Sequence, residues 1–205
     1  MKTKLSIALL TSLLALSPVA NANLSVNVGA INVNPDNDSS KINEAPTLGL
    51  RADDDTQLGI TVDYALDDNW VIELVAATPF SHDVQGAGGL AGNKIATIKH
   101  LPPTLLAQYH FLDSTYKFRP FVGVGVNYTV FFDEDFAAAP KSLGLSNLDL
   151  DGSFGLSAQL GADYHLDEKW SINASIRYID ISTEATFDVG GASVGKANID
   201  VDPMV

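Results

Sequence analysis

The fold is decided by residues Phe118–Phe132, which read FRPFVGVGVNYTVFF. Bulky residues alternate there with glycine, asparagine and threonine, a period of two that places all the bulk on one face of a β-strand. The preceding run, Thr104–Phe111, alternates in the same way, and the short polar link Leu112–Lys117 suits an antiparallel hairpin. The narrow face fits the interior of a barrel and the bulky face fits lipid, a pattern typical of a transmembrane β-barrel.

The N-terminus has the three parts of a secretory signal peptide. A basic start at Met1–Lys4 precedes an apolar run, Leu5–Leu16, and small residues at Ala20 and Ala22 provide a cleavage site. The run is too short to span a bilayer as a helix. We expect residues 1–22 to be a signal peptide cleaved near Ala22, and residues 23–205 to form one outer-membrane β-barrel domain.

Composition excludes several classes of function. The chain has 12 basic and 25 acidic residues and a formal charge of −13 at pH 7, which argues against nucleic acid as a partner. It has no cysteine, so it offers no disulfide, thiolate metal site or cysteine nucleophile. An exported chain without about 18 consecutive apolar residues enters a membrane only as a barrel.

Alternating segments recur along the chain and predict an all-β fold, an eight-stranded antiparallel transmembrane β-barrel. Besides the two strands above, they are Leu24–Val33, Thr56–Leu66, Trp70–Ala77, Ser153–Leu166, Trp170–Tyr178 and a last strand from about Ala197. Long loops are expected at 34–55, 79–93, 133–149 and around 190–191, and short turns between the other strands. In outer-membrane barrels the short turns lie in the periplasm. The last strand stops at Val205, so we expect it to be truncated and part of the first strand to be unpaired.

One sequence motif occurs twice. DYALDDNW at Asp63–Trp70 returns as DYHLDEKW at Asp163–Trp170, and in each a strand ends, turns on acidic residues and restarts with tryptophan. Ordinary hairpins also produce such a repeat. In a membrane barrel it predicts an aromatic girdle at one interface, made of Tyr64, Trp70, Tyr164 and Trp170.

Three stretches carry a resemblance to a known family. They are NWVIELVAATPF at Asn69–Phe80, IKHLPPTLLAQY at Ile98–Tyr109 and KFRPFVGVGVNYTVFF at Lys117–Phe132. With them the chain resembles the outer membrane protein W (OmpW) family of small Gram-negative barrels. The resemblance implies an outer-membrane location and a narrow channel for small hydrophobic molecules. Two channel positions of the family fall on Val75, an apolar match, and Arg177, where an aromatic residue is usual.

The inward positions predict what lines such a channel. On the third strand the inner face changes from Glu73 to Val75 and Ala77, and Phe131 lies near the outer end of the fifth. Apolar residues thus occupy both faces near the extracellular rim, which predicts a hydrophobic pocket that opens outward. Glu73 and Arg177 point inward by parity and should be paired in so narrow a lumen. They either fill the barrel as a buried ion pair or gate the channel.

Pro102 and Pro103 interrupt the fourth strand, and each removes a backbone donor from the ladder. One interpretation is that they lie above the bilayer, where a frayed ladder costs little. The other is that they mark a lateral exit, through which an apolar ligand passes sideways into the membrane.

Other polar groups carry little chemistry. His82, His100, His110 and His165 show no metal-ligand spacing, so we assign no metal, no cofactor and no catalytic residue, and we do not expect an enzyme. The acidic runs Asp53–Asp55 and Asp133–Asp135 are either solvated loops or bridges through divalent cations to lipopolysaccharide phosphates.

Two functions therefore remain. One is a passive channel for small hydrophobic solutes, favoured by the inward apolar residues. The other is a structural or receptor barrel, plugged inside, whose extracellular loops bind partners. The second is favoured by inward polar residues that form a continuous belt in this interpretation, namely Glu73, Arg177, Asp63, Gln108 and Asp163. In both, the expected surroundings are outer-membrane lipid and lipopolysaccharide, and the expected state is a monomer.

Overall fold

The computed structural model describes residues 23–36 and 48–205, and the expected signal peptide at residues 1–22 lies outside them. The strands are β1 (Leu24–Val33), β2 (Leu48–Ala52), β3 (Asp55–Ala65), β4 (Trp70–Ala77), β5 (Phe80–Gly88), β6 (Lys94–Leu101), β7 (Thr104–His110), β8 (Phe118–Phe136), β9 (Leu145–Leu150), β10 (Ser153–His165), β11 (Ser171–Ile179), β12 (Ser182–Val189) and β13 (Ala192–Asp200), with one short helix, α1 (Ala138–Ser142). Within these described ranges, no helix is long and apolar enough to cross a membrane.

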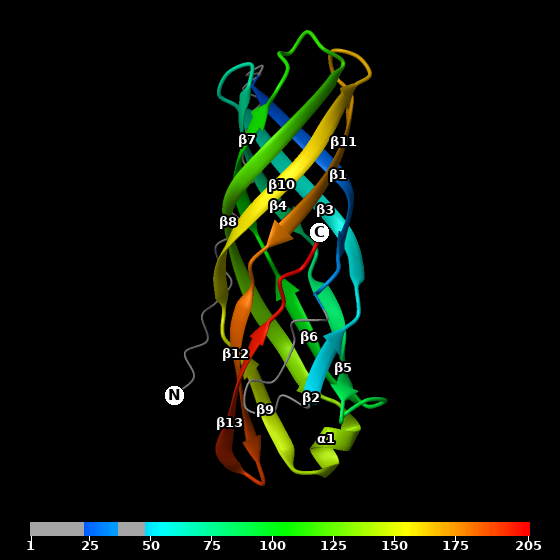
Figure 1. Cartoon of the computed structure of the whole chain (residues 1–205), viewed down its shortest axis with the longest axis vertical. Helices are drawn as coiled ribbons and strands as arrows, with labels where there is room; N and C mark the ends of the chain where they lie inside the picture. Colours follow the sequence, from blue (N-terminus) through cyan, green and yellow to red (C-terminus); the bar gives the residue numbers. More distant parts are fainter. Residues whose placement is uncertain (1–22, 37–47) are drawn as a thin grey trace, which may run out of the picture.

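The strands join into eight long lines that make one elongated barrel (Figure 1). β2 leads into β3, β4 into β5, β6 into β7, β9 into β10 and β11 into β12, each across a break of two residues. β8 runs unbroken through 19 residues, and β1 and the segment from β13 to Val205 complete the set. The paired strands are antiparallel throughout the described ranges, so the predicted eight-stranded antiparallel fold is confirmed.

The half of the barrel with the short turns has the strand order β1, β3, β4, β7, β8, β10, β11. Beyond β11 the wall continues at Val205, whose backbone exchanges hydrogen bonds of 2.8 and 2.7 Å with Arg177. Met204 in turn pairs with Asn34, next to the end of β1. A cavity of about 620 Å³ lies between β1 and β11, and Gly29 and Asn173 are among its lining residues.

The other half contains strands where the sequence predicted loops. β2, β5 and β6 pair in that order onto the far part of β8, and β9, β12 and β13 form a separate sheet. The expected loop at 79–93 was wrong because β5 turns Phe80, His82 and Val84 inward and the polar Ser81 and Asp83 outward. This is the alternation of a strand in water, which a search for an apolar outer face does not detect. The expected loops at 34–55 and 133–149 likewise hold β2, the end of β8, and β9.

The last strand begins earlier than predicted. It starts at Ala192 rather than near Ala197, and it pairs with β12 before Pro203 accepts a backbone hydrogen bond from Ile179 of β11. The reason is the pair Gly190 and Gly191, with φ of 59° and 86°. Two residues with positive φ close a tight hairpin, so β12 and β13 replace the long loop that was expected.

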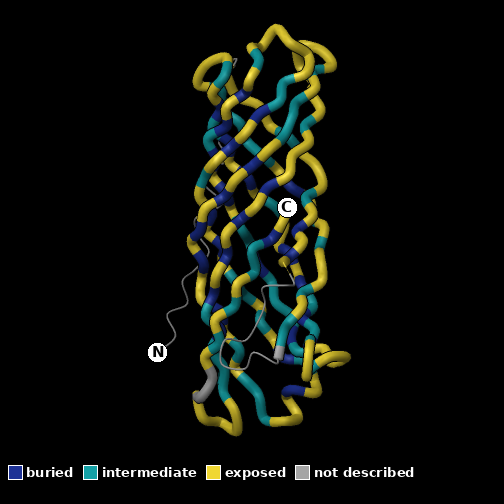
Figure 2. The backbone as a smooth tube through the Cα atoms, in the orientation of Figure 1, coloured by how far each residue is buried: buried dark blue, intermediate teal, exposed yellow. Residues whose placement is uncertain are grey.

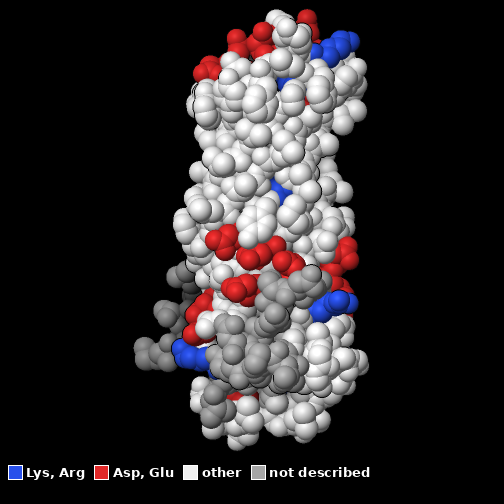
Figure 3. Space-filling model, in the orientation of Figure 1, with Lys and Arg blue, Asp and Glu red and all other residues white. Residues whose placement is uncertain are grey.

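The outer surface of the short-turn half is apolar. Buried and exposed residues alternate along its strands (Figure 2), and on β10 the outward Phe154, Leu156 and Leu160 are 70, 65 and 58% exposed. Figure 3 shows a band there that is nearly free of charged side chains. Such a surface is unfavourable in water and favourable in lipid, so this half is the membrane-spanning part.

The far half projects out of the membrane. Polar side chains predominate on the outward face of β5 and β6, and three of their charged residues form ion pairs: Lys94 with Asp83 at 2.7 Å, and Lys99 with Asp133 of β8 at 3.2 Å. Charged groups of this kind are placed in water rather than in hydrocarbon. Two-residue breaks separate successive strands along the chain, such as Thr78 and Pro79 between β4 and β5. These breaks therefore lie near the outer boundary of the lipid.

The four aromatic residues of the predicted girdle all lie on the outer surface at the short-turn end. Tyr64, Trp70 and Tyr164 are 45 to 46% exposed, and Trp170 is 70% exposed. The two turns have the same construction: the Asp67 and Asp167 carboxylates accept hydrogen bonds from the backbone N–H of Trp70 and Trp170. An aromatic girdle at the periplasmic interface requires this arrangement.

Gly125 and Gly155 line the inner face where backbones approach most closely. A Cβ at Gly125 would lie 2.0 Å from the carbonyl oxygen of Leu105, and one at Gly155 would lie 1.8 Å from that of Asp180. A backbone atom held in a ladder cannot move aside, so glycine is required there.

We expect Gly125→Ala to lower the free energy of unfolding by about 1–3 kcal/mol, because the added methyl group overpacks the wall. Urea unfolding in detergent micelles measures this loss. Gly29→Ala is the matched control, because a Cβ at Gly29 has no atom within 4 Å. Equal stability of the two variants would show that β7 and β8 leave room for a methyl group at position 125, contrary to the close contact described above.

Candidate functional site: the barrel lumen

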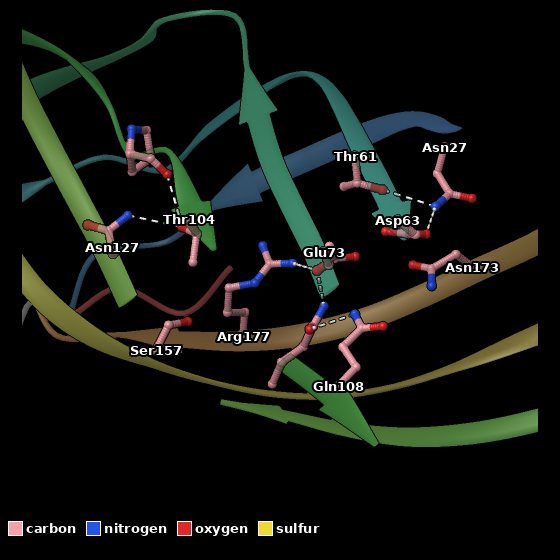
Figure 4. Close-up of polar contacts among 12 residues, drawn as sticks. Asn27, Thr61, Asp63, Glu73, Thr104, Gln108, Asn127, Ser157, Asn173 and Arg177 are labelled. Carbon is pink, nitrogen blue, oxygen red and sulfur yellow. Dashed lines mark hydrogen bonds and ion pairs between the residues drawn. The ribbon is translucent and has the colours of Figure 1, made fainter. Parts of the chain in front are cut away.

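A chain of buried polar side chains crosses the lumen within the membrane-spanning half (Figure 4). Arg177 Nη2 lies 3.1 Å from Glu73 Oε1, and both side chains are buried. Gln159 Nε2 donates to the same carboxylate oxygen at 3.1 Å, and Gln108 Nε2 donates to Gln159 Oε1 at 3.1 Å. His110 Nε2 lies 3.2 Å from Gln108 Oε1. These five residues are termed the polar belt.

The strand register sets the height of the belt. Arg177 lies opposite Gln159 in the pairing of β11 with β10, and inward alternation brings Glu73 of β4 to the same level. Gly123 provides the room, because a Cβ there would lie 3.0 Å from Gln159 Oε1. The structure thus brings together Glu73 and Arg177, which are 104 residues apart in the chain. Pairing and hydrogen bonding offset the cost of burying these charges, and Glu73 and Arg177 also line the cavity of about 620 Å³ between β1 and β11.

The belt is less extended than the sequence predicted. Asp63 accepts from Asn27 Nδ2 at 2.7 Å, and Asp163 accepts from Asn173 Nδ2 at 2.7 Å, each outside the chain of hydrogen bonds that holds Glu73. Both aspartates instead line a cavity of about 840 Å³ at the periplasmic end. The predicted belt was therefore wrong at Asp63, because parity gives the face of a residue but not its partner. Asp163 does contact the belt, since its Oδ2 lies 3.6 Å from His110 Nδ1.

Above the belt the lumen holds a small, mainly apolar cavity beside a second group of buried polar side chains, Thr104, Asn127 and Thr129. Phe80, which is fully buried, lies with Val75 and Ala77 around a cavity of only about 10 Å³, and Pro102 lines the same cavity. Three residues predicted to line a route thus meet at one place, together with Phe80, which the sequence analysis put in a loop. Phe80 closes this lower cavity from above, because its ring also stacks on His100 at a centroid distance of 5.5 Å.

The barrel wall is unpaired beside this lower cavity. The β4–β7 ladder stops at Val75↔Thr104, and pairing resumes only at Phe80↔His100 between β5 and β6. On the opposite edge the wall stays bonded, since the carbonyl of Pro103 accepts from Tyr128 N at 3.1 Å. The two prolines have no N–H to donate toward β4. The gap in the ladder therefore lies on one side only, opposite residues 76–79.

A second apolar cavity, termed the outer chamber, lies above Phe80 in the extracellular half. It has a volume of about 70 Å³ and is lined by Pro35, Leu50, Ala52, His82, Val84, Ile98, His100, Phe131, Leu150, Ile181, Thr183, Ile199 and Val201. Phe131 lies here, as its parity predicted. The space exceeds that of one water molecule several times over and suits a small apolar group.

The outer chamber contains a pair of histidines that the sequence analysis did not assign to a site. His82 and His100 are both 5% exposed, and their Nε2 atoms are 2.9 Å apart. The alternation of Phe80, His82, Val84 and Gly86 with Ser81, Asp83 and Gln85 is the signal that places His82 inside the barrel.

The acidic runs and a nucleophile motif contribute no further lumen chemistry. Asp133 and Asp135 are engaged by Lys99 at 3.2 Å and Lys141 at 2.7 Å, as expected of a solvated, locally neutralised surface. A Gly-x-Ser-x-Gly pattern also occurs, at residues 191–195. It lies in the β12–β13 hairpin, whereas a lipase-type nucleophile requires a strand-to-helix elbow.

An antiparallel barrel with an apolar outer band, an aromatic girdle and a polar interior defines an outer-membrane β-barrel protein. The model of the OmpW family matches residues 20–205, so the chain belongs to the OmpW family. It is 42% identical over 182 residues to outer membrane protein W of Vibrio cholerae, covering 88% of this chain and 83% of the relative. It is 46% identical over 157 residues to outer membrane protein W of Escherichia coli, covering 77 and 72%.

A solved structure supports the same assignment. The outer membrane protein OprG from Pseudomonas aeruginosa superposes with a TM-score of 0.79 at 43% identity, covering 89% of this chain and 90% of that one. These relatives are outer-membrane proteins of Gram-negative bacteria, and the present chain is accordingly an outer-membrane protein.

We expect Arg177→Met to destabilise the barrel by about 3–5 kcal/mol, because it leaves the Glu73 carboxylate buried without a counter-charge. The double variant Glu73→Gln/Arg177→Met should recover most of this loss, because no charge then remains in the belt. Urea midpoints in detergent measure both. If the double variant is as unstable as Arg177→Met alone, the loss of stability does not come from the unpaired Glu73 carboxylate.

Proposed function

We propose that this barrel is a passive route for small hydrophobic molecules from the cell exterior into the outer membrane. The observation that carries the proposal is the position of the outer chamber, which is apolar and lies above the polar belt, with Phe80 and the lower cavity between them. A solute attracted by the chamber cannot continue along the axis, since it would have to displace a buried ion pair and its hydrogen bonds. Its remaining way out is sideways.

The lateral exit in this proposal lies at Pro102 and Pro103. The unpaired wall between residues 76–79 and these prolines carries no ladder bonds that a passing solute would have to break. Ala76 and Ala77 provide small side chains on the β4 edge. Because the gap lies near the outer boundary of the apolar band, a solute that leaves there enters hydrocarbon directly and keeps its apolar surface out of water.

Phe80 is the barrier between the outer chamber and the exit in this scheme. It is fully buried and stacks on His82 and His100 above, while its other side lines the cavity at Pro102. A buried aromatic ring in a close-packed site moves only when neighbouring side chains move with it. Passage would therefore require rotation of the Phe80 side chain, which makes this residue a gate.

The alternative function is a plugged barrel whose extracellular half binds partners. The polar belt favours it, since small barrels commonly fill their interiors with side chains. The two functions differ in one measurable property, the uptake of an apolar solute.

We expect Val75→Arg to reduce uptake of N-phenyl-1-naphthylamine severalfold, because the charged side chain occupies the cavity beneath Phe80. Phe80→Ala should increase uptake, because it removes the barrier. Uptake is followed by fluorescence in vesicles with a lipopolysaccharide outer leaflet, which retards apolar solutes, and arabinose is the polar control. Unchanged uptake in a folded Val75→Arg protein would contradict the proposed passive route and favour the alternative, a plugged barrel that binds partners.

The lateral exit has a separate test. The chain has no cysteine, so Ala77→Cys/Pro102→Cys introduces a single possible disulfide across the unpaired wall. We expect the oxidised protein to take up the apolar solute severalfold more slowly, and a reductant to restore the rate.

A matched disulfide serves as the control for that test. Ala162→Cys/Ala174→Cys joins directly paired positions of β10 and β11, far from the prolines, and should leave uptake unchanged. If the oxidised Ala77→Cys/Pro102→Cys protein transports at the full rate, the solute leaves by another path.

A further inference from the structure

The two histidines of the outer chamber form a directed chain of hydrogen bonds. His82 Nδ1 lies 2.6 Å from the backbone carbonyl oxygen of Asp53. A carbonyl oxygen can only accept, so this ring nitrogen carries the proton. In a neutral imidazole the other nitrogen is then an acceptor, and His82 Nε2 therefore has a lone pair.

The direction of the second bond follows from the first. His82 Nε2 faces His100 Nε2 at 2.9 Å, and two lone pairs cannot meet at that distance, so His100 Nε2 carries the proton. In the neutral His100 ring, Nδ1 is consequently a bare acceptor. Burial lowers the pKa of His100 to about 3, which keeps the ring neutral at neutral pH.

This last acceptor has no partner. Among the described residues, His100 Nδ1 is buried without a hydrogen bond, and no other lining residue of the outer chamber has an unpaired buried side-chain atom. Thr183, the remaining polar side chain of the lining, already donates to the carbonyl of Asp151 at 2.6 Å. The His100 ring is also held in place, since it stacks on Phe80 and lies against Phe131 at a centroid distance of 5.8 Å.

His100 lines the apolar outer chamber, and its Nδ1 is a buried acceptor without a partner, so this side chain affects which ligands bind best there. A buried lone pair without a donor is costly, and a ligand that brings an O–H or N–H group removes that cost. An alkane or an ether fills the same apolar space but donates no hydrogen bond to the lone pair. A carboxylate also donates none, and its negative charge would be repelled by the lone pair. Sites that hydrogen-bond a substrate hydroxyl reject the analogue that lacks it.

We propose that the outer chamber selects small apolar molecules that carry one hydrogen-bond donor, alcohols in particular, through His100 Nδ1. This rests on the proposed function, because it specifies which hydrophobic molecules the route admits. His100 is in this view a specificity-determining residue, and His82 with the Asp53 carbonyl fixes its tautomer. The apolar lining binds the alkyl chain, and the histidine pair binds the hydroxyl group.

The test uses two isomers, 1-pentanol and methyl butyl ether, which have the same atoms and differ in that only the alcohol donates. Binding to the protein in lipid nanodiscs is measured at pH 8, above the ordinary imidazole pKa of about 6.5. We expect 1-pentanol to bind about tenfold more tightly, a ratio that corresponds to about 1.4 kcal/mol. The ¹⁵N resonance of His100 Nδ1 should shift with the alcohol and stay in place with the ether.

Two variants separate selectivity from simple space-filling. His82→Phe/His100→Phe removes both ring acceptors and keeps the aromatic lining, so the preference for the alcohol should disappear. Ile181→Val changes the volume of the outer chamber but leaves the histidines, so the preference should persist. If the double variant does not fold, the ¹⁵N shift in the unmodified protein decides.

The outcomes distinguish this inference from the function on which it rests. Equal binding of the two isomers, with no movement of the His100 resonance, would overturn the donor preference while leaving a chamber that binds apolar molecules. Absence of binding by either isomer would overturn the inference and the proposed route together.

Discussion

The constraint on which the structure depends is that hydrocarbon offers no partner to a backbone N–H or C=O group. Each spanning strand must therefore satisfy its backbone through its neighbours. The seven strands from β1 to β11 do so along one ladder, Met204 and Val205 bridge part of the distance between β11 and β1, and so few strands leave only a narrow interior. The narrowness explains the glycines: at Gly125 a methyl group would meet the backbone of β7. It also explains the outer surface, where large apolar residues that would be unfavourable in water face lipid.

A narrow interior in turn determines what a buried charge can do. Glu73 and Arg177 are both buried, and the pair is stable there because Arg177 supplies the counter-charge and Gln159 a further hydrogen bond to the Glu73 carboxylate. The pair lies across the lumen and borders the cavity between β1 and β11. The apolar space is thereby confined to the levels above the belt, next to the stretch of wall where two prolines end the ladder.

The character of the strands changes where they leave the membrane. In lipid the bulky residues point outward, but from Phe80 onward the same strand line turns its bulky residues inward and its polar residues outward. This inversion creates an apolar interior in the extracellular half, and it brings His82 and His100 into contact inside it. The outer chamber is a consequence of a barrel that continues from lipid into water.

The sequence alone determined the barrel, its strand number, the inward or outward face of nearly every spanning residue and the turns at Trp70 and Trp170, because a period of two in side-chain size is a local property. It also predicted that Val75, Phe131 and the prolines line the proposed route. It did not determine β5, β9 or β12, because their outer faces are polar. Nor did it determine that Gln159 joins the belt while Asp63 does not, or that His82 faces His100, since these contacts join residues from different strands. Only the register of the paired strands, which is a tertiary property, decides which inward side chains lie at the same height.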